Sequence, residues 1–289
     1  NMLVGKMDKH NQFESVPYLD KGYVKVVDWM GDDRLLAKTA RTSFDADAYE
    51  SDNKNKSLID YLVEHRHTSP LEMGDIVFEI KMPIFVMRQH VRHRTASLSE
   101  VSLRYSEQSG DYYLPEVERF RYQDQWNKQG SGEPMPRHIA ETCREMMQEV
   151  CDKEWDVYKK LIAAGVSKET ARGVLNVQYY TKCVWKMNVH NLMHYLKLRN
   201  SGHAQWEIQV MAEAIEGFFE KLFPMTYNAY TEYVANAVTF SRSEMEMLKQ
   251  IVSNSQFELA EKINGSARRA RDFYSKIGFE TEQKENKNG

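Results

Sequence analysis

The chain has 289 residues, of which 42% are hydrophobic and 28% are charged, and its formal net charge is -3. These values suit one or two globular domains and exclude disordered and fibrous chains. The acidic balance argues against a protein that coats nucleic acid, because such proteins carry a basic excess. The longest apolar runs, residues 83–87 and 218–223, fall far short of the ~20 residues of a membrane-spanning helix, so we expect no membrane segment.

The start of the chain and its cysteines indicate the compartment. The first residues lack the basic, apolar and small-residue succession of a secretion signal. Cys143, Cys151 and Cys183 form no C-x-x-C pair, and an odd number of cysteines cannot complete a set of disulfides. We therefore expect a cytoplasmic protein whose thiols are reduced and packed in the core.

The first part of the chain predicts two strands and two helices. Residues 22–29 alternate apolar and polar side chains, which predicts a strand, and residues 54–64 have helical spacing. A second strand is predicted at residues 75–82, with its apolar side chains on one face. Residues 83–92 follow as a helix with Pro83 at its first position, where proline is tolerated.

The second part predicts longer helices around one more strand. Residues 137–164 have the spacing of a long helix, and residues 176–187 alternate less regularly as a third strand. Residues 188–201 predict a helix capped by its first residue, an asparagine. Residues 205–222 predict another helix, which Pro224 closes.

Strands and helices are mixed without strict alternation, so the fold class is α+β, with a mixed or antiparallel sheet flanked by long helices. No repeat or linker interrupts the chain before residue 236, which predicts a single domain over residues 1–236. Ser241 and Glu244 then form a capping box that opens one more helix, and the end of the chain is rich in charge. Residues 237–289 are therefore predicted to be a C-terminal helical extension with a flexible tail.

Residues 88–104 concentrate basic side chains in this acidic chain. The segment holds four arginines and two histidines against one acid, Glu100. Helical spacing puts Arg88 and Arg92 on one face, where like charges repel by a few tenths of a kcal/mol unless a bound anion offsets them. Arginine suits bidentate phosphate contact, and nearby serines add hydroxyl donors. The alternative is a solvated basic helix end that complements the helix dipole.

The string Arg92-His93-Arg94, followed after seven residues by Ser102 and then by Arg104-Tyr105-Ser106, resembles the signature of the flavin-dependent thymidylate synthases, the ThyX family. Further agreement, in the family's order, lies in residues 39–45, 67–72, 83–86, 171–175, 196–199 and 203–208. The resemblance implies an enzyme that converts dUMP to dTMP. Methylenetetrahydrofolate is then the one-carbon donor, and bound FAD reduced by NADPH is the hydride source. It also implies a homotetramer with active sites between subunits.

The resemblance implies a set of residues that hold dUMP. Arginines of the set neutralise the phosphate, and Gln89 reads an amide-like edge of the uracil. Arg199 matches the arginine that stabilises the ionised N3 of the base and raises electron density at C5, which makes it the first catalytic candidate. The implied dUMP residues are Gln89, Arg92, Glu100, Ser102, Arg104, Arg172 and Arg199.

The resemblance also implies the flavin contacts and a second catalytic residue. Arginine and histidine near a flavin stabilise its anionic reduced ring. His67 matches a histidine placed near the folate and the flavin, and we assign it to methylene transfer. The implied FAD residues are Ser43, Ser69, Arg92, His93, Arg94, Glu100, Asn188, His190, His194 and His203.

Four positions depart from the family pattern. Ser99 stands where an asparagine is frequent, and Met73 stands where a histidine often follows the Pro-x-Glu stretch. His190 replaces a common arginine, and Asn176 replaces a proline that often follows Val-Leu. These departures concern the details of flavin contact more than the activity.

Simpler roles compete with some of these assignments. His190 and His194 stand at i, i+4, a spacing that also suits a metal, but no acid lies between them as in H-E-x-x-H, so we predict no metal site. Asn188 can be simply a helix cap, and His203 simply a helix-terminal histidine. We also predict no enzyme nucleophile. No cysteine has the Pro-Cys-His setting of the cysteine-dependent thymidylate synthases, and no Ser-His-Asp order surrounds Ser102.

Two other functions stay open from the sequence alone. One is a different flavin-dependent enzyme that modifies or reduces nucleotides on the same scaffold. The other is a non-catalytic module that uses residues 88–104 and nearby tyrosines to hold single-stranded nucleic acid. A salt titration on single-stranded DNA distinguishes the module, because a true binder shows strongly salt-dependent affinity.

Overall fold

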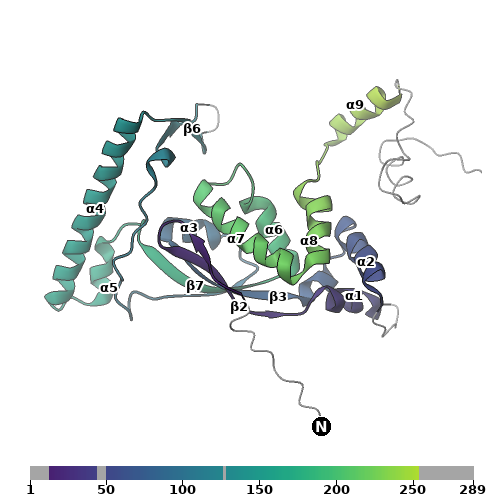
Figure 1. Cartoon of the computed structure of the whole chain (residues 1–289), viewed down its shortest axis with the longest axis horizontal. Helices are drawn as coiled ribbons and strands as arrows, with labels where there is room; N and C mark the ends of the chain where they lie inside the picture. The colour runs from purple at the N-terminus through teal and green to yellow at the C-terminus, as the bar shows by residue number, and fades with distance from the viewer. Residues whose placement is uncertain (1–12, 44–49, 126–127, 254–289) are drawn as a thin grey trace, which may run out of the picture. The chain divides into compact units, whose positions relative to one another are not determined.

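The computed structural model describes residues 13–43, 50–125 and 128–253, and a five-stranded antiparallel sheet lies at its centre (Figure 1). All four neighbouring strand pairs of this sheet run antiparallel. The predicted α+β class with an antiparallel sheet is therefore confirmed. In sheet order the strands are β1 (Val16–Tyr18), β2 (Gly22–Met30), β3 (Asp75–Pro83), β7 (Tyr180–Asn188) and β4 (Ser97–Glu100).

One face of the sheet forms the core. The predicted alternation is confirmed in β3, where Ile76, Phe78, Ile80 and Met82 are all fully buried. Phe78 pairs with Trp185 of β7, so the two rings lie on the same face. Three helices cover this face in Figure 1: α3 (Ile84–His90), α6 (Val189–Arg199) and α7 (Trp206–Leu222).

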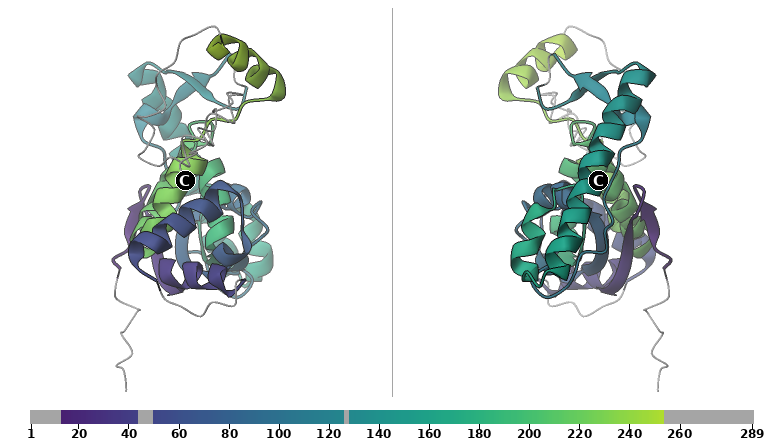
Figure 2. Two further views of the ribbon diagram at one scale, coloured as in Figure 1. Left: turned by 90° about the vertical axis from the view of Figure 1, so that its right-hand side faces the viewer. Right: turned by 90° about the vertical axis from the view of Figure 1, so that its left-hand side faces the viewer.

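Further elements surround this core. Figure 2 shows α1 and α2 side by side. A second, two-stranded sheet pairs β5 with β6. The remaining helices and strands are α1 (Asp33–Thr42), α2 (Asp52–Glu64), η2 (Ser69–Met73), η3 (Val117–Arg119), β5 (Arg121–Gln123), β6 (Ser131–Pro134), α4 (Arg137–Ala163), α5 (Lys168–Ala171), η4 (Arg172–Val174), α8 (Pro224–Tyr230), η5 (Thr231–Ala235) and α9 (Arg242–Ser253).

Helix α3 is shorter than predicted. Pro83 pairs with Tyr180 as the last residue of β3, and its extended backbone makes it the N-cap of α3. The helix ends at His90, so Arg92 lies beyond the C-cap, Val91. The prediction that Arg88 and Arg92 share one helical face was therefore wrong. Pro83 belongs to the strand, and the helix ends two residues before the predicted end, so Arg92 is not helical.

The sequence patterns missed three kinds of element. Strands β1 and β4 have only three and four residues, too few for alternation to be recognised. Helix α1 was not predicted, although Asp32 caps it by accepting the N–H of Leu35 at 2.8 Å. Pro224 closes α7 as expected but also begins α8, where its missing N–H costs nothing.

Two of the three cysteines are core residues, as predicted. Cys151 of α4 and Cys183 of β7 are buried, whereas Cys143 is partly exposed. Burial raises the pKa of Cys183 to about 12 and also raises the pKa of Cys151. Both thiols are therefore protonated near neutral pH, which makes them poor nucleophiles.

The chain divides at Asn236 into two compact units. In the second unit, Ser241 donates its N–H to Glu244 Oε2 at 2.7 Å, and Glu244 N–H donates to Ser241 Oγ at 3.4 Å, which confirms the predicted capping box of α9. The predicted flexible tail lies beyond residue 253, outside the described residues. The assignment of residues 1–236 and 237–289 to an enzyme domain and an extension stays a prediction. Within the described ranges, no helix has both the length and the apolar character to span a bilayer.

Asp33 joins the start of α1 to the start of α8. Its buried carboxylate accepts the N–H of Met225 at 2.7 Å, the N–H of Thr226 at 3.0 Å and the hydroxyl of Thr226 at 2.6 Å. We expect Asp33→Ala to lower the free energy of unfolding by about 2–3 kcal/mol, because three donors lose their buried acceptor. Urea denaturation measures this change. The exposed cap variant Asp32→Ala is the control, with an expected loss of about 1 kcal/mol, and equal losses would contradict the burial argument.

Candidate active site

A cavity of about 960 Å³ lies beside α3, between β3, β7 and the segment that follows β4. Helix α3 contributes Ile84, Met87, Arg88 and Val91 to its wall, positions that fall on one face of a helix. Glu100 at the end of β4 and Ser102 just after it line the cavity, and η4 adds Arg172. The cavity therefore combines apolar side chains of the helix with polar groups from separate segments, the usual composition of a small-molecule site.

Several cations of the cavity have no acidic partner. Arg88, Arg172 and Lys182 line it and are exposed. Among the residues that the structure describes, none of the three forms an ion pair. Unpaired cations around a concave surface concentrate anions, so an anionic ligand suits this cavity.

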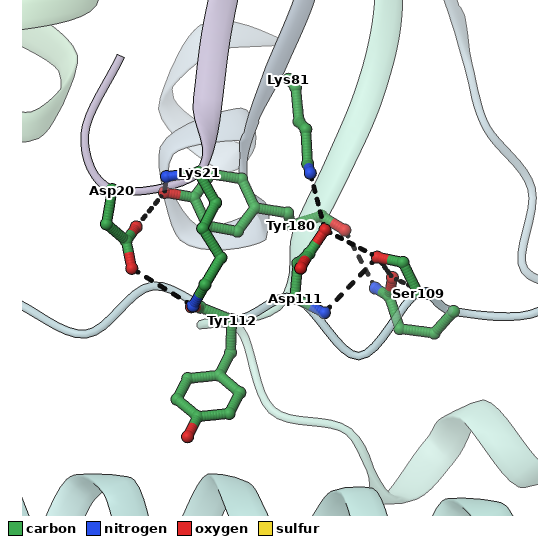
Figure 3. Close-up of polar contacts among 8 residues, drawn as sticks. Asp20, Lys21, Lys81, Ser109, Asp111, Tyr112 and Tyr180 are labelled. Carbon is green, nitrogen blue, oxygen red and sulfur yellow. Dashed lines mark hydrogen bonds and ion pairs between the residues drawn. The ribbon is translucent and has the colours of Figure 1, made fainter. Parts of the chain in front are cut away.

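A polar network fixes the wall of the cavity next to β3 (Figure 3). Lys81 Nζ lies 2.7 Å from Asp111 Oδ2, which also accepts the hydroxyl of Ser109 at 3.0 Å. The hydrogen bond from Lys81 holds the pKa of Asp111 below its usual value. Tyr180 donates its hydroxyl to Asp20 at 2.5 Å, beside this pair. The loop around Asp111 is thereby tied to the sheet, which gives the cavity a rigid side.

Arg199, the last residue of α6, forms a second cluster with residues of α3 and the turn after it. Its Nε donates to His93 Nε2 at 2.9 Å, and its Nη2 donates to the carbonyl of Gln89 at 3.4 Å. The Gln89 side chain donates to Gln205 Oε1 at 2.5 Å. Burial, together with the charge of Arg199 and the nearby His194, lowers the pKa of His93 to about 4. His93 is therefore neutral at pH 7, and its Nε2 is free to accept.

The structure divides the predicted dUMP residues into two groups. We call Glu100, Ser102 and Arg172 the cavity cluster, and Gln89 and Arg199, together with the predicted flavin residue His93, the Arg199 cluster. Helix α3 separates them, because Arg88 turns toward the cavity whereas Gln89, one residue later, turns toward α6 and α7. Two further predicted residues belong to neither cluster. Arg92 is exposed in the turn after α3, and Arg104 Nε pairs with Glu169 at 2.8 Å.

The predicted flavin residues gather only in part. The His194 ring lies 6.2 Å from the His93 ring, and His190 is one turn earlier on α6. Asn188 is the N-cap of α6 and accepts the N–H of Asn191 at 2.9 Å, so the simpler role is present. Most of the other predicted flavin residues are exposed, and within the described ranges they make no hydrogen bond to the Arg199 cluster. These residues are Ser43, Ser69, Arg94 and His203.

His67, the second predicted catalytic residue, is exposed after α2. Its ring meets that of Tyr61 at 5.4 Å, edge to face. Over the described ranges, no group of three histidine, cysteine or acidic side chains has a geometry that could hold a metal. Ser102 Oγ accepts the N–H of Arg104 at 3.3 Å, and no histidine in the described chain contacts it. The serine is thus arranged as a hydrogen-bonding group without a base.

Three cations of the cavity escaped the assignments made from sequence. Lys81 and Lys182 lie directly opposite each other on β3 and β7. Arg88 was recognised as part of a basic segment, but it received no role. Alternation within each strand places both lysines on the outer face, yet only the register brings them side by side. That register is not visible in a single sequence.

Comparisons with known proteins show the family of this chain. Residues 25–225 match the family model described as thymidylate synthase complementing protein. A flavin-dependent thymidylate synthase of Ehrlichia ruminantium (strain Gardel) is 40% identical over 235 residues, 81% of this chain and 79% of that protein. A flavin-dependent thymidylate synthase of Thermus thermophilus is 40% identical over 246 residues, 85% of this chain and 89% of that protein.

A solved structure shows a related fold. The crystal structure of the UMP/dUMP methylase PolB from Streptomyces cacaoi, bound with 5-Br dUMP, superposes with a TM-score of 0.68. It is 29% identical in sequence and covers 75% of this chain and 98% of that one. Since the family model covers well over half of the sequence and relatives share 40% identity over most of it, this chain belongs to the flavin-dependent thymidylate synthase family.

Proposed function

We propose that this protein converts dUMP to dTMP, with methylenetetrahydrofolate as the one-carbon donor and FAD reduced by NADPH as the hydride source. Family membership supports the reaction. The cavity supports the substrate class, since unpaired Arg88 and Arg172 beside the Ser102 hydroxyl suit a nucleotide phosphate. Use of NADPH and folate, a cytoplasmic setting and a homotetramer come from the family resemblance and stay predictions.

The observation that carries the proposal is the separation of the two clusters by α3. The cavity cluster offers the Arg172 guanidinium and the Ser102 hydroxyl for a phosphate, whereas the Arg199 cluster offers a guanidinium and an amide for a pyrimidine. Both are needed for one nucleotide, yet the neighbouring positions of α3 that border them, Arg88 and Gln89, point in directions about 100° apart. We propose that the two clusters of one active site come from different subunits of the homotetramer.

The donor set around the Arg199 cluster fits FAD. Arg92 and Arg94 are exposed and have no ion-pair partner among the described residues, so they are free to neutralise a diphosphate. His93 lies between them in the chain, and the His93 and His194 rings, 6.2 Å apart, are placed to contact the flavin. FAD, when bound, supplies the redox chemistry of the reaction. The chain's own residues bind and orient the reactants.

Arg199 has the clearest catalytic role in this scheme. Its Nε and Nη2 donate to His93 and to the Gln89 carbonyl inside the protein. The N–H groups on the opposite edge make no such bond and can stabilise the negative charge that develops on the pyrimidine. His67 is assigned to methylene transfer. No side chain attacks the base, since the buried Cys151 and Cys183 are held as thiols and Ser102 lacks a base.

The absorbance spectrum of the purified protein tests the class of enzyme. A yellow protein whose flavin is bleached by NADPH without oxygen, and which then forms dTMP from dUMP and methylenetetrahydrofolate, supports the proposal. Protein that binds FAD and forms no dTMP under these conditions contradicts the reaction. Protein that binds no FAD contradicts the cofactor.

Mixing two variants tests the shared site, in an assay at a dUMP concentration well below the raised KM of Arg172→Ala, where each variant alone has little activity. Arg172→Ala damages the cavity cluster, and Arg199→Ala damages the Arg199 cluster. In tetramers mixed one to one, about a quarter of two-chain sites combine two intact clusters, so about a quarter of wild-type activity is expected. The control mixes Arg199→Ala with Gln89→Ala, which damages the same cluster in both chains and should recover nothing. No recovery in the first pair, in tetramers shown to be mixed, would contradict a site shared between subunits.

A further inference from the structure

Two pairs of side chains connect the end of α3 and the turn after it to α6. We call His90 and Tyr195 the inner pair, and His93 and Arg199 the outer pair. His90 is the last residue of α3, and His93 lies in the turn after it, where its N–H donates to the His90 carbonyl at 3.2 Å. Tyr195 and Arg199 stand four apart on α6 and share one face of that helix. His90 contacts Tyr195, and His93 contacts both Tyr195 and Arg199, so the turn brings the two histidines to the same side.

The inner pair, His90 and Tyr195, is fully buried. His90 and Tyr195 are both 0% exposed, and His90 Nδ1 lies 3.2 Å from the Tyr195 hydroxyl. The His90 ring also packs 4.4 Å from Trp185. Burial, aided by the charges of His93 and Arg199, lowers the pKa of His90 to about 3, so the ring is neutral. Its Nε2 has no hydrogen-bond partner in the described part of the chain. A buried polar pair with an unpartnered nitrogen costs stability compared with an apolar pair.

The outer pair, His93 and Arg199, packs against the inner pair through the Tyr195 ring. The His93 ring packs edge-on against the Tyr195 ring, with centroids 4.7 Å apart. On its other side, His93 Nε2 accepts the Arg199 Nε–H at 2.9 Å. For this bond Nε2 must carry no proton, so the neutral ring holds its proton on Nδ1. The position of the phenol thus sets the position of the imidazole that Arg199 contacts.

Arg199 is held along one edge of its guanidinium. The Nε and Nη2 donors of that edge bond to His93 and to the Gln89 carbonyl. Because the group is planar, two bonds on one edge define the direction of the opposite N–H groups. Small displacements of such a group matter, since a misplacement of ~1 Å can cost about a hundredfold in rate.

We propose that His90 and Tyr195 are positioning residues, whose buried hydrogen bond sets Tyr195 against His93 and so aims the Arg199 guanidinium at the pyrimidine. The inference rests on the proposed function, because it takes the ligand of Arg199 to be dUMP. It goes beyond the family resemblance, which assigns no role to either residue. It also accounts for a polar pair in a core where apolar side chains of the same shape would be less costly.

Tyr195→Phe is the sharpest variant, since it removes the hydroxyl and keeps the ring against His93. We expect kcat for dTMP formation to fall about tenfold or more, because the guanidinium is misplaced. FAD content and the dUMP KM should change less, by about threefold at most, because no group that binds either molecule is removed. The matched control is Tyr18→Phe, which removes another fully buried hydroxyl, bonded to the Glu207 carbonyl at 2.8 Å. The control should lower the melting temperature and leave kcat unchanged. A Tyr195→Phe enzyme that loses only melting temperature, like the control, would overturn the proposal.

A double-mutant cycle shows whether the effect passes through Arg199. If Tyr195 acts by positioning the guanidinium, Tyr195→Phe should lower kcat in the wild-type background and have no further effect in Arg199→Ala. Equal fold-losses in both backgrounds would mean that Tyr195 acts independently of Arg199, which contradicts the proposal.

A readout without turnover separates this inference from the proposed reaction. In protein with ¹⁵N-labelled histidine, the His93 signals, assigned with His93→Gln, should show Nε2 unprotonated in the wild type. They should show mixed protonation of the two nitrogens in Tyr195→Phe. If the wild type forms no dTMP, the proposed function fails while this measurement still tests the positioning. Identical His93 signals in wild type and Tyr195→Phe would overturn the positioning even in an active enzyme.

Discussion

Arg199→Ala is expected to lower the turnover of dTMP formation about a hundredfold or more, the usual cost of removing a preorganised group that stabilises developing charge. The flavin should remain bound, because Arg199 is one of many polar groups in its neighbourhood. Its two protein contacts, to His93 and to the Gln89 carbonyl, hold it in place before substrate arrives, so the loss should appear in kcat. Single-turnover oxidation of the reduced flavin in the presence of dUMP and the folate measures this step.

The control for Arg199→Ala is the variant Arg144→Ala. Arg144→Ala removes a half-buried arginine that donates to the Pro115 carbonyl at 3.0 Å, outside both clusters. It should lower stability without changing the rate. If Arg199→Ala instead raised the dUMP KM and kept kcat, Arg199 would bind substrate and transition state equally, and its catalytic role would be wrong.

Arg172→Ala is expected to raise the dUMP KM by about tenfold to a hundredfold, because a hydrogen bond to a charged group contributes ~1.5–3 kcal/mol. Turnover at saturating dUMP should change little, since the phosphate is remote from the reacting carbon and its binding is the same in ground and transition states. Arg172 lines the cavity beside Ser102 without an acidic partner in the described chain, so its charge is available to the ligand. Steady-state kinetics with dUMP as the varied substrate measure the effect.

The matched control for Arg172 is Arg137→Ala. Arg137 is an exposed arginine outside the cavity that already pairs with Glu141 at 2.8 Å. Its removal should leave the dUMP KM unchanged, because exposed ion pairs contribute ~1 kcal/mol or less and no ligand contact is lost. An Arg172→Ala enzyme with a normal KM and a low kcat would contradict the phosphate role and move Arg172 into the chemistry.

Local patterns were enough for the elements that form the core. The alternation of residues 75–82 predicted a strand because one face of a sheet is buried and the other is not, and Ile76, Phe78, Ile80 and Met82 occupy the buried face. The capping box at Ser241 and the cap at Asn188 were readable because a cap depends on neighbours within four residues. Where a strand was short, as in β4, the signal was too weak to predict it.

The family signature predicted which residues carry the chemistry, and its dense string of arginines and histidines suits an anionic ligand. It could not say how they are grouped. Arg88 and Gln89 are adjacent in sequence, yet the turn of α3 sends one to the cavity and the other toward Arg199. Under the proposed function, this separation is the reason to expect that one nucleotide contacts two chains.

The sequence by itself determined the fold class, the core strands and the family, because each depends on residue types at short spacing. Tertiary structure alone decided the partners of those residues. The register of β3 against β7 brings Lys81 beside Lys182, and the packing of α3 on α6 joins His90 to Tyr195, 105 positions apart. Such contacts depend on how distant segments pack, and no local pattern encodes that packing.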